Sequence, residues 1–108
     1  MIYVISASGT DYVKIGVAKN PVARMRTLQT GVPMVLVLIA TADWPNRIEG
    51  RLHSVLRAAH VRGEWYTACP SIDSLIKHMH SGSTDPMTWM RSVIGGPKRL
   101  AKVLAIAA

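Results

Sequence analysis

A small set of side chains in this sequence is of the types that act on phosphate esters. Tyr3 and Lys14 supply a phenol and an ammonium, and Arg24 supplies a planar guanidinium whose donors suit a phosphate. Glu49 and His53 are spaced so that a helix would place the carboxylate and the imidazole on one face. Such groups can bind a divalent ion, hold a phosphate and transfer a proton, which are the requirements of phosphodiester cleavage.

Each of these residues also has a purely structural explanation. Tyr3 could be a partly buried core aromatic, and Lys14 a solvated lysine on a strand. Arg24 could be a solvated helix arginine. A glutamate and a histidine at this spacing on an exposed helix face often form only a solvated pair, so Glu49 and His53 alone do not define a site. The residue types therefore leave both interpretations open.

The net charge favours a polyanionic partner. Lysine and arginine number 13 against 6 aspartate and glutamate residues, which gives +7 at pH 7 and an isoelectric point near 10.2. Nucleic acid is the first candidate partner, and an anionic membrane surface is the second. Arg26 on the helix of Arg24, and Arg57 on the helix face of Glu49 and His53, are further candidates for nucleic-acid contacts.

Length and composition exclude several other classes of protein. A chain of 108 residues, 49% of them hydrophobic, can form one compact domain with a packed core. Cys69 is the single cysteine, so a disulfide-stapled secreted protein is excluded and a reducing cytoplasm is expected. We see no apolar run of roughly 18 residues and no signal peptide. Glycine-rich phosphate loops and serine elbows are also missing from the sequence.

The first two elements are predicted to be strands that form an antiparallel hairpin. Residues 1–6 are rich in β-branched and aromatic types, and residues 11–17 alternate between apolar and other residues. A loop over residues 7–10 would place Tyr3 directly opposite Lys14 on one face. The other face would carry the apolar residues Ile2, Val4, Val13 and Ile15.

The rest of the chain is predicted to be mainly helical. Asn20 and Pro21 are typical of a helix start, and Gly31 is a candidate C-cap. The predicted elements are a helix over 20–31, a strand buried on both faces over 34–41, a helix over 43–60, a short strand or extended segment over 64–66, and helices over 70–80, 86–94 and 97–108. This order indicates a small α+β domain with a C-terminal helical appendage.

Five short motifs in this sequence resemble one known pattern. They are Met1-Ile2-Tyr3, Lys14-Ile15-Gly16, Arg24, Glu49-Gly50-Arg51-Leu52-His53 and Gly63-Glu64-Trp65-Tyr66. In this order they resemble the GIY-YIG endonuclease superfamily. The closest likeness is to its phage and bacterial branch, which carries KIG, E-x-x-x-H and GEW-aromatic motifs. Three departures are Met1 in place of the first glycine, Lys14 in place of a tyrosine, and Leu28 in place of a helix histidine.

The resemblance implies a fold and an activity. It implies a three-stranded antiparallel sheet flanked by helices over residues 1–80, followed by a linker and a C-terminal helical tail over residues 81–108. Members of this superfamily cut DNA with one divalent ion, here Mg²⁺ or Mn²⁺. RNA remains open as a substrate, and no membrane partner is expected.

The resemblance also implies roles for individual residues. Tyr3 would help to activate the attacking water, Arg24 would stabilise the phosphate transition state, and Glu49 would hold the metal ion. His53 and Tyr66 would lie near the site. The motif residues Gly16, Gly63, Trp65 and Tyr66 would have structural roles. A lysine at position 14, beside Tyr3, would favour the phenolate by charge proximity and could equally hold a phosphate.

Two other functions are compatible with the sequence. One is a nucleic-acid-binding module that kept the fold and lost the chemistry. The other is a protein-interaction subunit, suggested by residues 97–108, where apolar Leu100, Val103 and Leu104 accompany three basic residues. That tail could dock back on the domain, act as a basic arm on DNA, or form a homo-oligomer contact.

Overall fold

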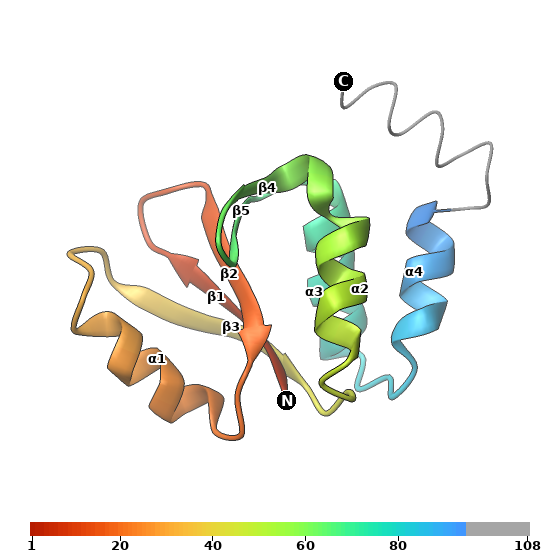
Figure 1. Ribbon diagram of the computed structural model, residues 1–108, viewed down its shortest axis with the longest axis horizontal. Helices are drawn as coiled ribbons and strands as arrows, with labels where there is room; N and C mark the ends of the chain where they lie inside the picture. Colours follow the sequence, from red (N-terminus) through yellow and green to blue (C-terminus); the bar gives the residue numbers. More distant parts are fainter. Residues whose placement is uncertain (95–108) are drawn as a thin grey trace.

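A computed structural model describes residues 1–94 as a five-stranded antiparallel sheet with helices on both faces (Figure 1). The strands are β1 (Ile2–Ala7), β2 (Tyr12–Val17), β3 (Leu36–Ala42), β4 (His60–Arg62) and β5 (Trp65–Thr67), in the order β3-β1-β2-β5-β4. The helices are α1 (Pro21–Gln29), α2 (Ile48–Val55), α3 (Pro70–His80) and α4 (Pro86–Ile94), with a 3₁₀ turn η1 (Arg57–Ala59). The predicted helix over 97–108, and any contact it makes, lies outside the described residues.

The predicted α+β class is confirmed, but the sheet has more strands than predicted. β5 confirms the short strand offered as one alternative for residues 64–66, whereas β4 was not predicted; each has three residues, too few to show a periodic pattern. The helix predicted over 43–60 is shorter than predicted at both ends. It begins at Ile48, after a turn in which the Ile48 amide donates to the Pro45 carbonyl, and residues 60–62 form β4 instead.

The predicted hairpin is present, but its register differs from the predicted one. The structure pairs Tyr3 with Gly16 and Ile5 with Lys14, so Tyr3 and Lys14 are not directly opposed. The reason is that β1 continues through Ala7 and β2 begins only at Tyr12, which moves the loop one residue along the chain. Both side chains still lie on one face of the sheet, because the shift moves both ends of the loop and preserves the alternation.

Each face of the sheet has its own apolar core. The core against α2, α3 and α4 includes Ile2, Val4, Val13 and Ile15 of the hairpin, as predicted, together with helix residues such as Leu52, Ile72 and Trp89. The core against α1 contains Tyr3, Ile5, Ala7 and Leu36, with Met25 and Leu28 packed against it. Burial of a large apolar side chain contributes roughly 1.5–3 kcal/mol, so these two cores fix the helices on the sheet.

The structure differs from the prediction at the end of α1 and in the segment that leads into β3. The predicted C-cap Gly31 is not the end of α1, which is capped by Thr30. The Gln29 side chain instead ties the helix to β3, since its Oε1 accepts from the Leu36 amide at 2.7 Å. β3 is an edge strand whose side chains enter both cores, Leu36 on the side of α1 and Ala40 and Ala42 on the other side. The prediction of a strand covered on both faces is therefore confirmed in the main, with Val37 as an exception at 45% exposure.

The helix predicted over 86–94 is present as α4. Trp89 and Met90 of α4 are buried in the apolar core that lies between the sheet and the helices α2 and α3. The Trp89 indole Nε1 donates to Ser74 Oγ on α3 at 3.1 Å. Within residues 1–94, no helix is both long and apolar enough to cross a membrane.

Candidate active site

The close approach of three chain segments at Gly16 creates the candidate site. Gly16 is paired with Tyr3 across β1 and β2. A Cβ atom added at Gly16 would lie 2.5 Å from the Tyr3 hydroxyl oxygen, and it would also overlap the carboxylate of Glu64. Real Cβ atoms do not approach other atoms so closely. Because glycine has no Cβ, the phenol of Tyr3 and the carboxylate of Glu64 can meet over β2.

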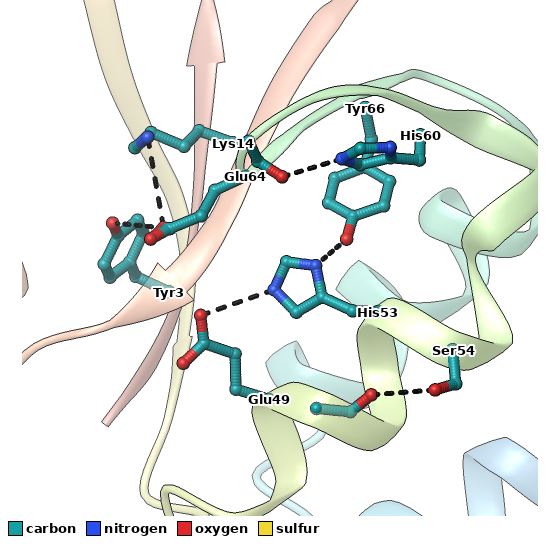
Figure 2. Close-up of polar contacts among 10 residues, drawn as sticks. Tyr3, Lys14, Glu49, His53, Ser54, His60, Glu64 and Tyr66 are labelled. Atoms are coloured by element: carbon teal, nitrogen blue, oxygen red, sulfur yellow. Dashed lines mark hydrogen bonds and ion pairs between the residues drawn. The ribbon is translucent and has the colours of Figure 1, made fainter.

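Glu64 joins the phenol and the ammonium into one cluster (Figure 2). The Tyr3 hydroxyl donates to Glu64 Oε2 at 3.3 Å, and Lys14 Nζ lies 3.9 Å from the same oxygen. The Glu64 side chain is 33% exposed and the Lys14 side chain only 12%. Because the pair is partly shielded from water, it is screened less than a surface ion pair.

The turn between β4 and β5 positions Glu64. Gly63 has a φ of 55°, a left-handed conformation that glycine adopts without strain. The Glu64 carbonyl then accepts from the Ile15 amide at 3.0 Å, which locks the turn to β2. The next residue, Trp65, is paired with Lys14, and Lys14 Nζ lies 5.4 Å from the centre of its ring.

Glu64 is the site residue that the sequence analysis did not single out. It appeared only as one letter of the GEW motif, with no role of its own. The available signal was an acidic residue beside a glycine turn, in a chain that has only 6 acidic residues.

The environment of Tyr3 favours its neutral form. Burial raises the pKa of Tyr3 above its ordinary value of 10.0, and the negative charge of Glu64 raises it further. The Arg24 guanidinium lies close enough to lower the pKa in part, but the net direction is upward. The prediction that Lys14 would favour the phenolate is therefore wrong, because the Lys14 ammonium faces the Glu64 carboxylate and that carboxylate faces the phenol.

A second chain of polar groups runs from β5 to α2. The Tyr66 hydroxyl contacts His53 Nδ1, and His53 Nε2 lies 3.3 Å from Glu49 Oε1 (Figure 2). An ionised carboxylate only accepts, so Nε2 carries the hydrogen and Nδ1 of a neutral ring accepts from Tyr66. Tyr66 is 1% exposed and part of the main core, so its hydroxyl is a rigid anchor for the imidazole.

Glu49 is the side chain best placed to hold a metal ion. It lies in the first turn of α2, its side chain is 31% exposed, and it points toward the Tyr3–Glu64 pair in Figure 2. Within residues 1–94, no group of three or more histidine, cysteine, aspartate or glutamate side chains is gathered around one point. A single carboxylate such as that of Glu49 suits an ion such as Mg²⁺, which takes oxygen ligands and keeps several waters.

The predicted nucleic-acid contacts occupy different surfaces. Arg24 and Arg26 are exposed on α1, and of these two only Arg24 influences the Tyr3 hydroxyl. Arg57 is exposed in η1 and lines a cavity of about 280 Å³ with His53 and Tyr66. The structure thus brings Tyr3, Lys14 and Gly16 together, and the charge of Arg24 acts on the Tyr3 phenol, whereas Arg26 and Arg57 lie outside that cluster.

Comparison with known families identifies the domain to which these residues belong. The sequence profile of the T5orf172 domain matches residues 1–80. The chain belongs to the T5orf172 domain family. This is a nuclease-like family. The T5orf172 domain here includes all five strands, α1 to α3 and every residue of the two polar clusters. No curated protein and no solved structure matches the chain.

Proposed function

We propose that this protein is a metal-dependent endonuclease that hydrolyses DNA phosphodiester bonds by a single-metal mechanism. The observation that carries the proposal is the contact of Tyr3, Lys14 and Glu64 over Gly16, inside a T5orf172 domain. The likeness of the five sequence motifs to GIY-YIG endonucleases supports the same reaction class. The charge of +7 supports a polyanionic substrate.

Tyr3 and Glu64 form a path for the proton of the attacking water. Tyr3 is a neutral phenol whose hydroxyl already donates to Glu64 Oε2. A water that donates to the phenol oxygen passes its proton to Tyr3 while Tyr3 passes its own proton to the carboxylate. The resulting hydroxide forms the new O–P bond, the bond to the leaving oxygen breaks, and that oxygen takes a proton from water. Tyr3 is unchanged at the end of the step, and Glu64 returns its proton to the solvent.

The cations of the site offset the charge of the phosphate. Arg24 approaches the Tyr3 hydroxyl from α1, and its fork of donors can hold two phosphate oxygens beside the attacking water. Lys14 is shared between Glu64 and the ring of Trp65, so it is held in one place before a phosphate arrives. Preorganised charges of this kind stabilise a transition state without a reorganisation cost.

Glu49 would hold Mg²⁺ or Mn²⁺ through its partly exposed carboxylate. A bound ion supplies Lewis-acid stabilisation of phosphate charge and makes its bound water easier to deprotonate. Both ring nitrogens of His53 are engaged, by Glu49 and by Tyr66. His53 is therefore a positioning residue, which orients Glu49 and does not itself touch the substrate.

Plasmid nicking tests the proposal. Supercoiled plasmid is incubated with Mg²⁺ and the wild-type protein, or with Glu49→Gln or Arg24→Ala. Matched controls are Asp73→Asn and Arg91→Ala, which remove the same charges at exposed positions of α3 and α4. We expect each site variant to nick at least about 100-fold more slowly, while the controls and the wild type nick alike.

Two results would reject the proposal. Equal nicking by the wild type and both site variants would show that the activity does not come from this site. Salt-dependent binding of DNA by the wild type, with no nicking at any Mg²⁺ or Mn²⁺ concentration, would instead identify a binding module without chemistry.

A further inference from the structure

The face of the sheet that carries the site continues into a second surface. Gly16, Lys14 and Tyr12 alternate along β2 and therefore share one face. Trp65 on β5 is paired with Lys14 and lies beside this row. From Gly16 to Tyr12 the strand spans about 14 Å, at roughly 3.4 Å per residue. A continuous surface thus leads from the Tyr3–Glu64 pair to the start of β2.

A cavity of about 460 Å³ lies at that end of the sheet. Its walls are Ala7, Tyr12, Met34, Val61, Arg62 and Trp65. Tyr12 is 45% exposed and Val61 is 50% exposed, although both side chains are large and apolar. Exposed apolar surface gathered around a cavity with one charged residue is typical of a ligand site rather than of a folding core.

The chemistry of the walls fits a nucleobase. Tyr12 and Trp65 offer aromatic rings, and bases of any sequence stack on such rings. Arg62 lines the cavity, and Lys14 lies over the Trp65 ring on the side of the proposed active site. The cations can therefore bind the phosphates on both sides of a base that enters the cavity.

We propose that this cavity binds one unpaired base of the substrate strand, so that the protein acts on nucleic acid with single-stranded nucleotides in preference to continuous duplex. The inference rests on the proposed function for the place of the scissile phosphate, beside Tyr3 and Glu64. The distance from Gly16 to Tyr12 equals a few nucleotides, because stacked bases rise about 3.4 Å each. A base inside a duplex offers only its edges, so its ring face reaches Tyr12 only after unstacking.

Binding without divalent metal tests the inference separately from cleavage. The full chain is titrated, in EDTA, into a short single-stranded oligonucleotide that carries 2-aminopurine, and into the same sequence as a duplex. The variants are Tyr12→Ala, Tyr12→Phe, which keeps the ring, and the control Val37→Ala. Val37 has the same 45% exposure as Tyr12, but it is paired with Ser6 and faces the other side of the sheet.

We expect the wild type to quench 2-aminopurine in the single strand and to bind it more tightly than the duplex. Tyr12→Ala is expected to weaken single-strand binding by about 5- to 100-fold, as for the loss of one stacked base, and to abolish the quenching. Tyr12→Phe and Val37→Ala should bind like the wild type. Backbone pairing of Tyr12 with Thr67 does not depend on the side chain, so Tyr12→Ala keeps the strand.

Two results would overturn the inference. One is single-strand binding that Tyr12→Ala leaves unchanged, and the other is an equal loss of single-strand and duplex binding. Either result leaves the nuclease proposal intact if the wild type still nicks plasmid with Mg²⁺. Conversely, single-strand binding that depends on Tyr12 in a protein that never nicks DNA would support the base site and reject the nuclease.

Discussion

The hydroxyl of Tyr3 lies 3.3 Å from Oε2 of Glu64, although 61 residues separate the two in sequence. Tyr3 comes from the first strand of the chain, and Glu64 from the turn before β5. The two meet because β5 pairs with β2 beside β1, and because Gly16 leaves space between them. This contact gives a buried phenol a proton acceptor, and it is the basis of the proposed chemistry.

Removing the phenol oxygen should stop the proton transfer and leave the fold intact. Tyr3→Phe keeps the buried ring and leaves Glu64 partly exposed to water, so no buried group loses its only partner. We expect nicking about 100-fold slower or more, with DNA binding within a few-fold of the wild type. Rates from single-turnover nicking and affinities from anisotropy check this. Unchanged nicking would remove Tyr3 from the mechanism.

The raised pKa of Tyr3 predicts a loss of stability in alkali. The folded state holds the phenol proton more tightly than the unfolded chain, whose tyrosine pKa is about 10. Below that pH both states are protonated, so Tyr3 adds no slope. Above it only the unfolded chain releases the proton, so the free energy of unfolding falls as pH rises. Urea unfolding at several pH values between 9 and 11 should show a steeper fall for the wild type than for Tyr3→Phe. Parallel curves would contradict the raised pKa.

The close contacts at Gly16 predict that alanine lowers the stability of the protein at Gly16 and raises it at Gly50. Gly16→Ala would force a Cβ against the Tyr3 hydroxyl and the Glu64 carboxylate, and we expect a loss of about 1–3 kcal/mol of stability together with the loss of nicking. Gly50→Ala, on α2, meets no atom within 4 Å and is expected to stabilise the protein by about 0.5–1 kcal/mol. Thermal and urea unfolding measure both. Equal effects at the two positions would contradict the crowding at Gly16.

Tyr66 should act on metal binding through His53. Tyr66→Phe removes the hydroxyl that contacts His53 Nδ1 and keeps the buried ring. We expect the Mg²⁺ concentration for half-maximal nicking to rise about 10- to 100-fold, as for other partners of metal ligands. The maximal rate should recover at high Mg²⁺, in contrast to Glu49→Gln. A lower maximal rate with an unchanged Mg²⁺ requirement would argue against a positioning role for His53.

Much of the fold could be predicted from the sequence because its signals are local. The alternation in β1 and β2 assigned the apolar residues Val13 and Ile15 to one face, and the structure confirms this. Asn20 caps α1 as predicted, since its Oδ1 accepts from the Ala23 amide at 3.1 Å. These features depend on residues that are near one another in the chain.

The differences arise where distant segments decide the outcome. The register of the hairpin depends on where β1 ends, and Ala7 continues the strand because it pairs with Leu36 of β3. β5 is a strand because it pairs with the edge of β2, and β4 is a strand because it pairs with β5. The partner of Lys14 is likewise a residue from the β4–β5 turn, which no local pattern in the hairpin could indicate. The sequence thus offered the residue types of a candidate site, but it did not indicate that Glu64 would contact both Tyr3 and Lys14.

The position of a bound Mn²⁺ ion tests the central claim most directly. A crystal of the wild-type protein soaked in Mn²⁺ is measured at the manganese absorption edge, beside a Glu49→Gln crystal treated alike. We predict an anomalous peak beside Glu49, within reach of Tyr3 and Arg24, and no peak there in the variant. A peak that persists in Glu49→Gln, or that lies only on a surface away from Tyr3 and Glu64, would contradict the proposed active site.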